Sequence, residues 1–422
     1  MTLAYLSTPL VGLVDTAVIG QLGVPALIGG VAVGAIIFDV VFTTFNFLRS
    51  GTTGLSAQAL GGGHHVEQNA IVLRALILAA ISGVLVLALQ WPILEAGLAL
   101  IEASEAVEAA TREYFSIRVL AAPFALANYA ILGWLLGQAR AGLGLLLQVL
   151  LNGTNIALSI FLVLELNWGV PGIAWATVVG EAVAAFAGGI LVVRMIGRTG
   201  WPAREIVLSR AKFIRMIAIN RDIMIRSFTL LAAFAFFTAQ GARSGEILLA
   251  ANAVLMNFFM VAGYFLDGFA TAAEQLAGRA VGARWRPAFD RAVRLTLIWG
   301  IAIAGFLSLV FWFAGPLMID IMTTAPEVRL TARDYLIWSA LTPIAGVVAF
   351  QMDGIFIGST WSRDMRNMML VSLAIYLAAW WFLTPIYGNH GLWISLLIFL
   401  GLRGISLSWR CGIRARQTFS AA

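Results

Sequence analysis

The run IVLRALILAAISGVLVLAL, residues 71–89, contains one charged residue, Arg74. A helix needs about 20 mostly apolar residues to cross a hydrocarbon core of about 30 Å. A transmembrane strand would instead alternate in polarity over roughly ten residues, and this run does not. We therefore predict a membrane-spanning helix over residues 68–91.

Apolar segments of similar length recur along the whole chain. The predicted spans are residues 1–20, 27–50, 68–91, 114–137, 144–165, 170–193, 216–240, 247–270, 293–315, 334–357, 367–388 and 391–409. Proline inside them, as at Pro9, Pro123 and Pro343, is tolerated in membrane helices and marks kinks. The predicted fold is an all-α membrane protein of twelve transmembrane helices.

The composition excludes several classes of protein. Hydrophobic residues make up 61% of the 422 residues and charged residues 11%, against about 25% charged residues in a soluble domain. A soluble enzyme or a secreted disulfide-rich protein would not have this composition. The single cysteine, Cys411, cannot form an internal disulfide, and His64, His65 and His390 are too scattered for a metal centre. We expect no metal, no cofactor and no catalytic residue.

Basic residues are concentrated in alternate loops of this topology. They are Arg194, Arg198, Arg204, Arg210, Lys212 and Arg215 in one loop, Arg279, Arg284, Arg286, Arg291 and Arg294 in another, and Arg140, Arg363, Arg366, Arg410, Arg414 and Arg416 elsewhere on the same side. The opposite loop over 95–113 is acidic. Because cytoplasmic loops are enriched in arginine, this predicts an inner-membrane protein with both termini in the cytoplasm. It also explains the net charge of +6 without nucleic-acid binding.

The two halves of the sequence share three patterns in the same order. Gly51-x6-Gln58 matches Gly268-x6-Gln275, Pro123-x9-Gly133-x3-Gly137 matches Pro343-x10-Gly354-x3-Gly358, and Trp168-Gly169-x-x-Gly172 matches Tyr387-Gly388-x-x-Gly391. A parallel repeat of two bundles is an arrangement of secondary transporters. We predict two six-helix bundles related by a pseudo-two-fold repeat, residues 1–200 and 201–422.

Six phrases, in order along the chain, are specific to one transporter family. They are TPLVGLVDTAVIGQLG (8–23), FLRSGTTGLSAQA (47–59), NRDIMIRSF (220–228), FFTAQGAR (236–243), LAANAVLMNF (249–258) and MDGIFIGST (352–360). They resemble the DinF branch of the multidrug and toxic compound extrusion (MATE) transporters. The resemblance implies export of organic, often cationic or amphipathic, compounds in exchange for protons or sodium ions, with protons usual in this branch.

The sequence departs from the family at its start. Family members normally carry additional residues before the first helix, whereas Asp15 here lies fourteen residues after Met1. We therefore expect that the natural start lies upstream of Met1. Mass spectrometry of the native protein would test this.

Asp15 is the strongest candidate for coupling transport to an ion. It lies in the middle of an apolar span, where a carboxylate costs at least about 2.5 kcal/mol and is a functional candidate by default. Burial raises the pKa of such a group, which can then bind and release a proton as its access to water changes. Asp15 matches the first-helix aspartate that the family uses for coupling. The other interpretation is a structural hydrogen bond to a neighbouring helix.

Uncharged polar residues are predicted around this aspartate. Asn128, Asn155 and Thr177 resemble those that surround it in family members, although each could instead be a contact between helices. Many relatives carry a second acid four residues after the asparagine, where this chain has Ser159. A serine cannot titrate, so either Asp15 acts alone or another acid compensates.

Two carboxylates in the first half could compensate. Glu181 lies one turn beyond Thr177, so the two share a helix face, and Asp39 lies in the middle of the second span. We prefer Glu181 to Asp39 as the auxiliary acid. Either residue could instead face water or form a structural pair.

The second half carries a polar set of its own, made of Arg226, Asp267, Glu274 and Asp353. Asp267 and Glu274 are two helical turns apart and share a face. An arginine among carboxylates lowers the cost of burying them all, so we favour a structural ion-pair network. The other interpretation is a second cation or proton site, and Asp353 is the member expected nearest the central path.

The sequence favours one of four possible functions. The preferred function is a secondary antiporter that acts as a monomer. Its expected partners are small organic substrates and the lipid bilayer, and nucleic acid is not expected among them. The alternative is a flippase for a lipid-linked precursor, but that would need a basic cavity and most arginines here lie in loops. An enzyme would need a nucleophile or a metal cluster, for which the sequence offers no candidate. A channel is disfavoured because repeated bundles suit alternating access.

Overall fold

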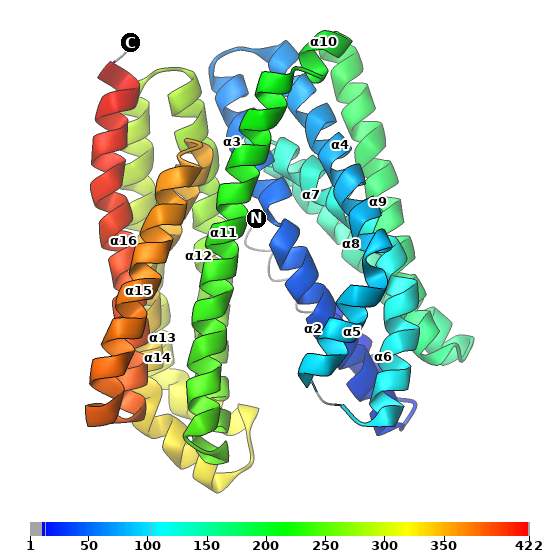
Figure 1. The fold of residues 1–422 in the computed structure, drawn as a ribbon, viewed down its shortest axis with the longest axis vertical. Coiled ribbons are helices and arrows are strands. Elements are labelled where there is room, and N and C mark those ends of the chain that lie inside the picture. The colour runs from blue at the N-terminus through cyan, green and yellow to red at the C-terminus, as the bar shows by residue number, and fades with distance from the viewer. Residues whose placement is uncertain (1–10, 13, 102, 421–422) are drawn as a thin grey trace. The chain divides into compact units, whose positions relative to one another are not determined.

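The structure is a computed structural model, of which residues 11–12, 14–101 and 103–420 are described. These residues form helices joined by short connections, and none of them is in a strand (Figure 1). Eleven helical stretches are long and apolar enough to cross a membrane, and they coincide with the second to twelfth predicted spans. The first predicted span lies partly outside the described residues, as do Met1 and Pro9. Residues 14–20 of that span are helical.

The chain forms two compact units that divide between Asn220 and Arg221, inside α11. The sequence placed the boundary at residue 200. The first unit contains α2 (Pro25–Phe45), α3 (Phe47–Gly61), α4 (His65–Ala88), α5 (Gln90–Ile101), α6 (Glu105–Arg118), η1 (Val119–Ala121), α7 (Ala122–Gly137), α8 (Ala141–Ile160), η2 (Phe161–Glu165), α9 (Gly169–Thr199), α10 (Arg204–Val207) and the first part of α11 (Arg210–Arg243). The second unit contains the rest of α11 with α12 (Glu246–Gly282), α13 (Arg286–Met322), α14 (Pro326–Gly358), α15 (Ser362–Tyr387) and α16 (Asn389–Ser420).

The spans over Pro25–Gly61 and Glu105–Gly137 are interrupted within their length. The span over α2 and α3 breaks at Asn46, whose side-chain oxygen accepts a hydrogen bond from Arg49 Nε at 3.1 Å. The span over α6 and α7 narrows to the 3₁₀ turn η1 just before Pro123. Proline lacks the amide hydrogen that would continue the α-helical ladder, so the tighter turn precedes it.

The connections are shorter than the sequence predicted. The acidic segment over 95–113 is mostly helical, because α5 ends at Ile101 and α6 begins at Glu105. The basic segments over 194–215 and 279–294 are also largely helical. Hydrophobic runs mark only the apolar centre of a helix, and Glu105 and Glu108 in the first turn of α6 favour helix there through the helix dipole.

Each unit has an apolar core of its own. In the first unit, Phe38 on α2 stacks on Phe115 of α6 with ring centroids 4.6 Å apart. In the second, Phe258 on α12 packs against Phe311 of α13 at 5.2 Å, and the buried Trp393 of α16 lies 4.9 Å from Phe237 of α11. These contacts hold the helices on which the polar residues lie.

Closely packed glycines fix the register of the internal repeat. A Cβ atom on Gly133 of α7 would collide with the carbonyl of Arg49 on α3, and one on Gly354 of α14 would collide with the carbonyl of Ala270 on α12. Gly133 and Gly354 differ by 221 in number (354 − 133), and Arg49 and Ala270 differ by the same amount (270 − 49). The two units therefore share one pattern of helix contacts.

The repeat match at Gly51 and Gly268 was wrong by one helical turn, because these residues differ by only 217 (268 − 51). Helix ends support the spacing of 221, since the left-handed residues that follow α3 and α12 are Gly63 and Arg284. Glycine and glutamine are frequent enough in such helices that a match of two residues can slip by one turn.

Candidate functional site

Asp15 lies in the helical segment over 14–20 of the first unit and is 8% exposed. Ser159 on α8 donates a hydrogen bond from Oγ to Asp15 Oδ1 at 2.8 Å. No cationic side chain among the described residues forms an ion pair with Asp15. The residue that replaces the family's second acid is therefore the one that contacts the first-helix aspartate.

Two further polar pairs extend from this contact across the unit. Asn155, one turn before Ser159 on α8, donates from Nδ2 to Thr177 Oγ1 on α9 at 3.0 Å. One turn further along α9, Glu181 accepts from Asn128 Nδ2 of α7 at 2.6 Å through Oε2, and its backbone carbonyl accepts from the same nitrogen at 3.0 Å. The shared faces expected from the spacing bring five of the predicted residues into one ladder of contacts.

The ladder leaves one acceptor without a partner. Asn155 is 1% exposed, and its Oδ1 accepts no hydrogen bond from any described residue. A buried amide oxygen is normally satisfied, so an unpaired one at a polar site is informative. It lies on the residue one turn from the serine that holds Asp15.

Asp39 lies apart from these pairs. It is exposed on α2 and makes no hydrogen bond with another described residue, although Arg118 acts on it electrostatically. Arg118, at the end of α6, is a residue that the sequence analysis missed. It donates to the Tyr114 hydroxyl, lies 4.9 Å from the centre of the Phe38 ring, and interacts electrostatically with Asp15 and Glu181. Its only signal in the sequence is a charge inside the fourth predicted span.

In the second unit, Arg226 and Asp353 of the predicted set are brought together. Asp353 on α14 is 5% exposed and accepts through Oδ2 from Arg226 on α11. The same oxygen accepts from Arg403 Nη2 on α16 at 2.7 Å. Arg403 was also missed by the sequence analysis. Glu274 is buried on α12 and Asp267 is exposed on the same helix.

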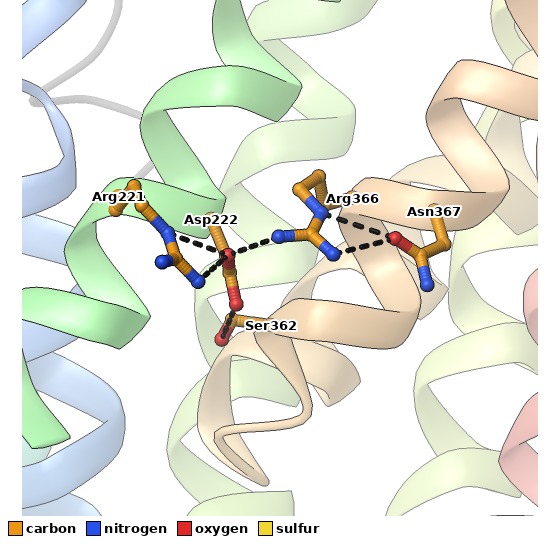
Figure 2. A network of polar contacts seen from close by, with 5 residues as sticks. All are labelled: Arg221, Asp222, Ser362, Arg366 and Asn367. Carbon is orange, nitrogen blue, oxygen red and sulfur yellow. Dashed lines mark hydrogen bonds and ion pairs between the residues drawn. The ribbon is translucent and has the colours of Figure 1, made fainter.

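A separate cluster surrounds Asp222, which follows Arg221 in the NRDIMIRSF phrase (Figure 2). Asp222 Oδ1 accepts from Arg366 Nη1 of α15 at 2.7 Å and from Arg221 Nη2 at 3.0 Å. Its Oδ2 accepts from Ser362 Oγ at 3.3 Å. These contacts join the beginning of α15 to α11, so we interpret the cluster as structural.

The isolated ligand-type side chains do not converge in the described part of the chain. No group of three or more histidine, cysteine, aspartate or glutamate side chains able to hold a metal occurs there. His390 accepts a hydrogen bond from Trp338 Nε1 at 2.8 Å, and Cys411 is a buried free thiol.

Comparison with known proteins identifies the family. The MatE family model matches residues 1–161 and 223–382. The chain belongs to the MatE family. It is therefore a membrane transporter of the multidrug and toxic compound extrusion type, and the predicted resemblance is confirmed.

Individual relatives agree with this assignment. The chain is 40% identical to DNA damage-inducible protein F of Escherichia coli, covering 100% of this chain and 92% of that protein. It is 26% identical to a probable multidrug resistance protein NorM of Caulobacter vibrioides, covering 97% and 90%. The match to the Escherichia coli protein supports the predicted DinF branch.

Solved structures support the fold. A crystal structure of MATE in the bent conformation matches with a TM-score of 0.88 at 20% identity, covering 100% of this chain and 95% of that one. A MOP superfamily transporter from Pyrococcus furiosus matches with a TM-score of 0.86, also at 20% identity, covering 100% and 94%. The predicted all-helical membrane fold is confirmed by these matches.

Proposed function

We propose that this MatE protein is a proton-driven antiporter that exports organic, cationic or amphipathic compounds across the inner membrane by alternating access. Both termini face the cytoplasm in this proposal, and the protein acts as a monomer on small substrates without a cofactor. The observation that carries it is the contact between the buried Asp15 and the neutral Ser159 hydroxyl. A carboxylate held by neutral groups can change its charge without leaving a buried cation unpaired.

The neighbouring groups can accommodate both protonation states of Asp15. The charged carboxylate accepts the Ser159 hydroxyl. A protonated carboxyl group is itself a donor and needs an acceptor. Asn155 Oδ1, buried and without a hydrogen-bond donor among the described residues, supplies one a single turn away on the same helix as Ser159. Proton binding would then draw the Asp15 segment towards Asn155 and change the packing of the first unit.

Glu181 acts as the auxiliary acid in this proposal. Its carboxylate also has a neutral amide partner, Asn128, and it shares the electrostatic influence of Arg118 with Asp15. A proton and a substrate can drive one transport cycle only when each binds the two facing states with different affinity. Coupled carboxylates on different helices give the proton that difference.

The test uses everted membrane vesicles that contain the protein. Their interior is acidified, the gradient is followed with a pH-sensitive dye, and ethidium is added without sodium. The wild type should lose its gradient on ethidium addition, and Asp15→Asn should not. Asp290→Asn is the matched control, because Asp290 is an exposed acid at the start of α13 that pairs with Arg286 at 3.5 Å.

The outcomes separate the components of the proposal. Equal loss of the gradient in the wild type and in Asp15→Asn would remove Asp15 from coupling and direct attention to Glu181. Ethidium export that appears only with sodium would replace the proton by sodium as the coupling ion. Movement of a lipid-linked precursor without ethidium export would favour the flippase.

A further inference from the structure

The ion-pair cluster of the second unit contains buried polar atoms that have no hydrogen-bond partner among the described residues. Arg403 Nη2 and Arg226 Nη2 both donate to one oxygen, Asp353 Oδ2. The other oxygen, Asp353 Oδ1, is buried and accepts no hydrogen bond from a described residue. The Nε atoms of both arginines are likewise buried and donate to no described residue.

The chemistry of the arginine side chain explains why these atoms are left over. Nε and Nη2 form one edge of the planar guanidinium group, and this edge binds the two oxygens of a carboxylate side by side. Asp353 can satisfy only one such edge. Because two arginines share its Oδ2, each has half of its edge occupied and the other half empty. A second carboxylate would complete both pairs.

We propose that the second unit binds a carboxylate of the transported compound at Arg226, and that the substrates therefore include zwitterionic amphipathic compounds. On binding, Arg403 would pair with both oxygens of Asp353, and Arg226 would turn its edge to the substrate. All three unpaired buried atoms would then gain partners. This inference rests on the proposed export function and narrows its substrate class.

The burial of the two arginines gives the direction of access. The Arg226 side chain is 16% exposed, whereas that of Arg403 is 3% exposed. Arg403 also lies 5.5 Å from the centre of the Phe399 ring, which restrains it on its own side. A carboxylate therefore reaches Arg226 first, and Arg403 with Asp353 forms the fixed base of the site.

The protein itself contains two other sources of the same chemical group. Asp267 on α12 is exposed and acts electrostatically on Arg403, and Glu274 is buried two turns further along that helix. A shift of α12 could bring an internal carboxylate to Arg226 in place of a substrate. The experiment must therefore distinguish an internal carboxylate from one on the substrate.

The experiment measures dye binding to the purified full chain in lipid nanodiscs. The probes are the zwitterionic dye rhodamine B and its ethyl ester, which differ only in the free carboxylate. Fluorescence anisotropy gives the two dissociation constants without any ion gradient. The wild type should bind the acid about tenfold more tightly than the ester, as expected for one charge-assisted pair of hydrogen bonds.

Variants of Arg226 test the mechanism of recognition. Arg226→Gln should remove the preference for the acid while the ester binds as before, and the Arg403–Asp353 pair remains to support folding. Arg226→Lys keeps the charge but not the planar edge, so it should retain only part of the preference. If Arg226→Gln fails to fold, the comparison of acid and ester in the wild type and in Arg226→Lys decides the question.

Three results would overturn the site. One is equal affinity of the wild type for the acid and the ester. Another is a loss of affinity for both dyes in Arg226→Gln. The third is a preference for the acid that appears only in Asp267→Asn, which would mean that the internal carboxylate occupies Arg226. Because binding is measured without a gradient, failure of this site is distinct from failure of proton antiport in vesicles.

Discussion

A buried carboxylate of the first unit and one of the second have opposite chemical surroundings. Asp15 in the first unit contacts a serine hydroxyl, whereas Asp353 in the second accepts from two arginines. The two carboxylates do not occupy equivalent positions of the repeat, because they differ by 338 in number (353 − 15) rather than by 221, so each unit places its buried acid on a different helix. A carboxylate among neutral groups can be neutralised without leaving a cation unpaired, whereas one between two arginines is the anion that both of them share. The comparison shows that a buried carboxylate is surrounded by neutral groups in one unit and by cations in the other.

The largest expected difference is in stability. Asp353→Asn leaves the buried Arg403 and the partly buried Arg226 without their shared anion, and breaking a buried pair costs about 3–5 kcal/mol in the free energy of unfolding. Asp15→Asn keeps an amide oxygen that can accept from Ser159 and leaves no cation without a partner. It should therefore lower the free energy of unfolding by less than about 1 kcal/mol. Thermal unfolding of both variants in detergent would measure this. Similar losses in the two variants would contradict the contrast.

Removing Arg226 supplies the control for that experiment. The double variant Asp353→Asn with Arg226→Gln leaves one unpaired cation instead of two. It should therefore recover part of the lost stability, and a further loss would show that the cost does not come from stranded charge.

Helix packing gives a second, smaller contrast between the units. A Cβ atom on Gly358 of α14 would collide directly with the carbonyl of Glu274, whereas one on the equivalent Gly137 of α7 would lie 2.6 Å from the Thr53 carbonyl. Gly358→Ala should therefore cost about 1–3 kcal/mol of stability and more than Gly137→Ala, because overpacking displaces backbone. The free energy of unfolding of each variant, measured with denaturant, checks the order.

Gly305→Ala is the matched control for the packing effect. Gly305 lies inside α13, and a Cβ atom there would meet nothing within 4 Å. Alanine should be neutral or stabilising at this position, because glycine costs about 0.5–1 kcal/mol inside a helix. A loss in Gly305→Ala as large as in Gly358→Ala would mean that the collision is not the cause.

The contact between Ser159 and Asp15 should have a smaller effect on stability than on transport. Ser159→Ala removes one hydrogen bond, which is worth about 0.5–1.5 kcal/mol, and leaves a small space. It should also lower ethidium-dependent proton movement in vesicles, because Asp15 loses the group that holds its charged form. Ser159→Thr retains the hydroxyl and should restore most of the transport rate. Transport that is equally low in both variants would show that shape rather than the hydroxyl matters.

The spans, several partners of the site and Arg226 could be predicted, but Arg118 and Arg403 could not. Hydrophobic runs locate helix centres, and the one-turn spacing of Thr177 and Glu181 correctly predicted a shared face. Arg118 and Arg403 were missed because a single arginine in an apolar span looks the same whether it pairs inside the protein or reaches the interface. Arg226 and Asp353 are 127 residues apart, so only the fold brings them together. Asp267 and Glu274 are two helical turns apart, but Asp267 is exposed and Glu274 is buried, and helical spacing does not predict burial.

The smallest expected effect lies at the surface of the first unit, where Glu95 on α5 pairs with Arg112 on α6. Arg112 Nη2 donates to Glu95 Oε2 at 3.1 Å, and Nη1 donates to the other oxygen. This hydrogen bond with Arg112 lowers the pKa of the Glu95 carboxyl group below its ordinary value. A carboxyl group with a lowered pKa in the folded state stabilises the protein above its unfolded pKa, and this contribution is lost as the pH falls through the folded pKa. Glu95→Gln should therefore melt slightly below the wild type at neutral pH, and the two melting temperatures should converge in acid. Because both side chains are exposed, added salt should shrink the difference. A difference that grows in acid would have the wrong sign for this pair. It would also contradict the expectation that the exposed ion pair of Glu95 contributes less to stability than the buried ion pairs of Asp353.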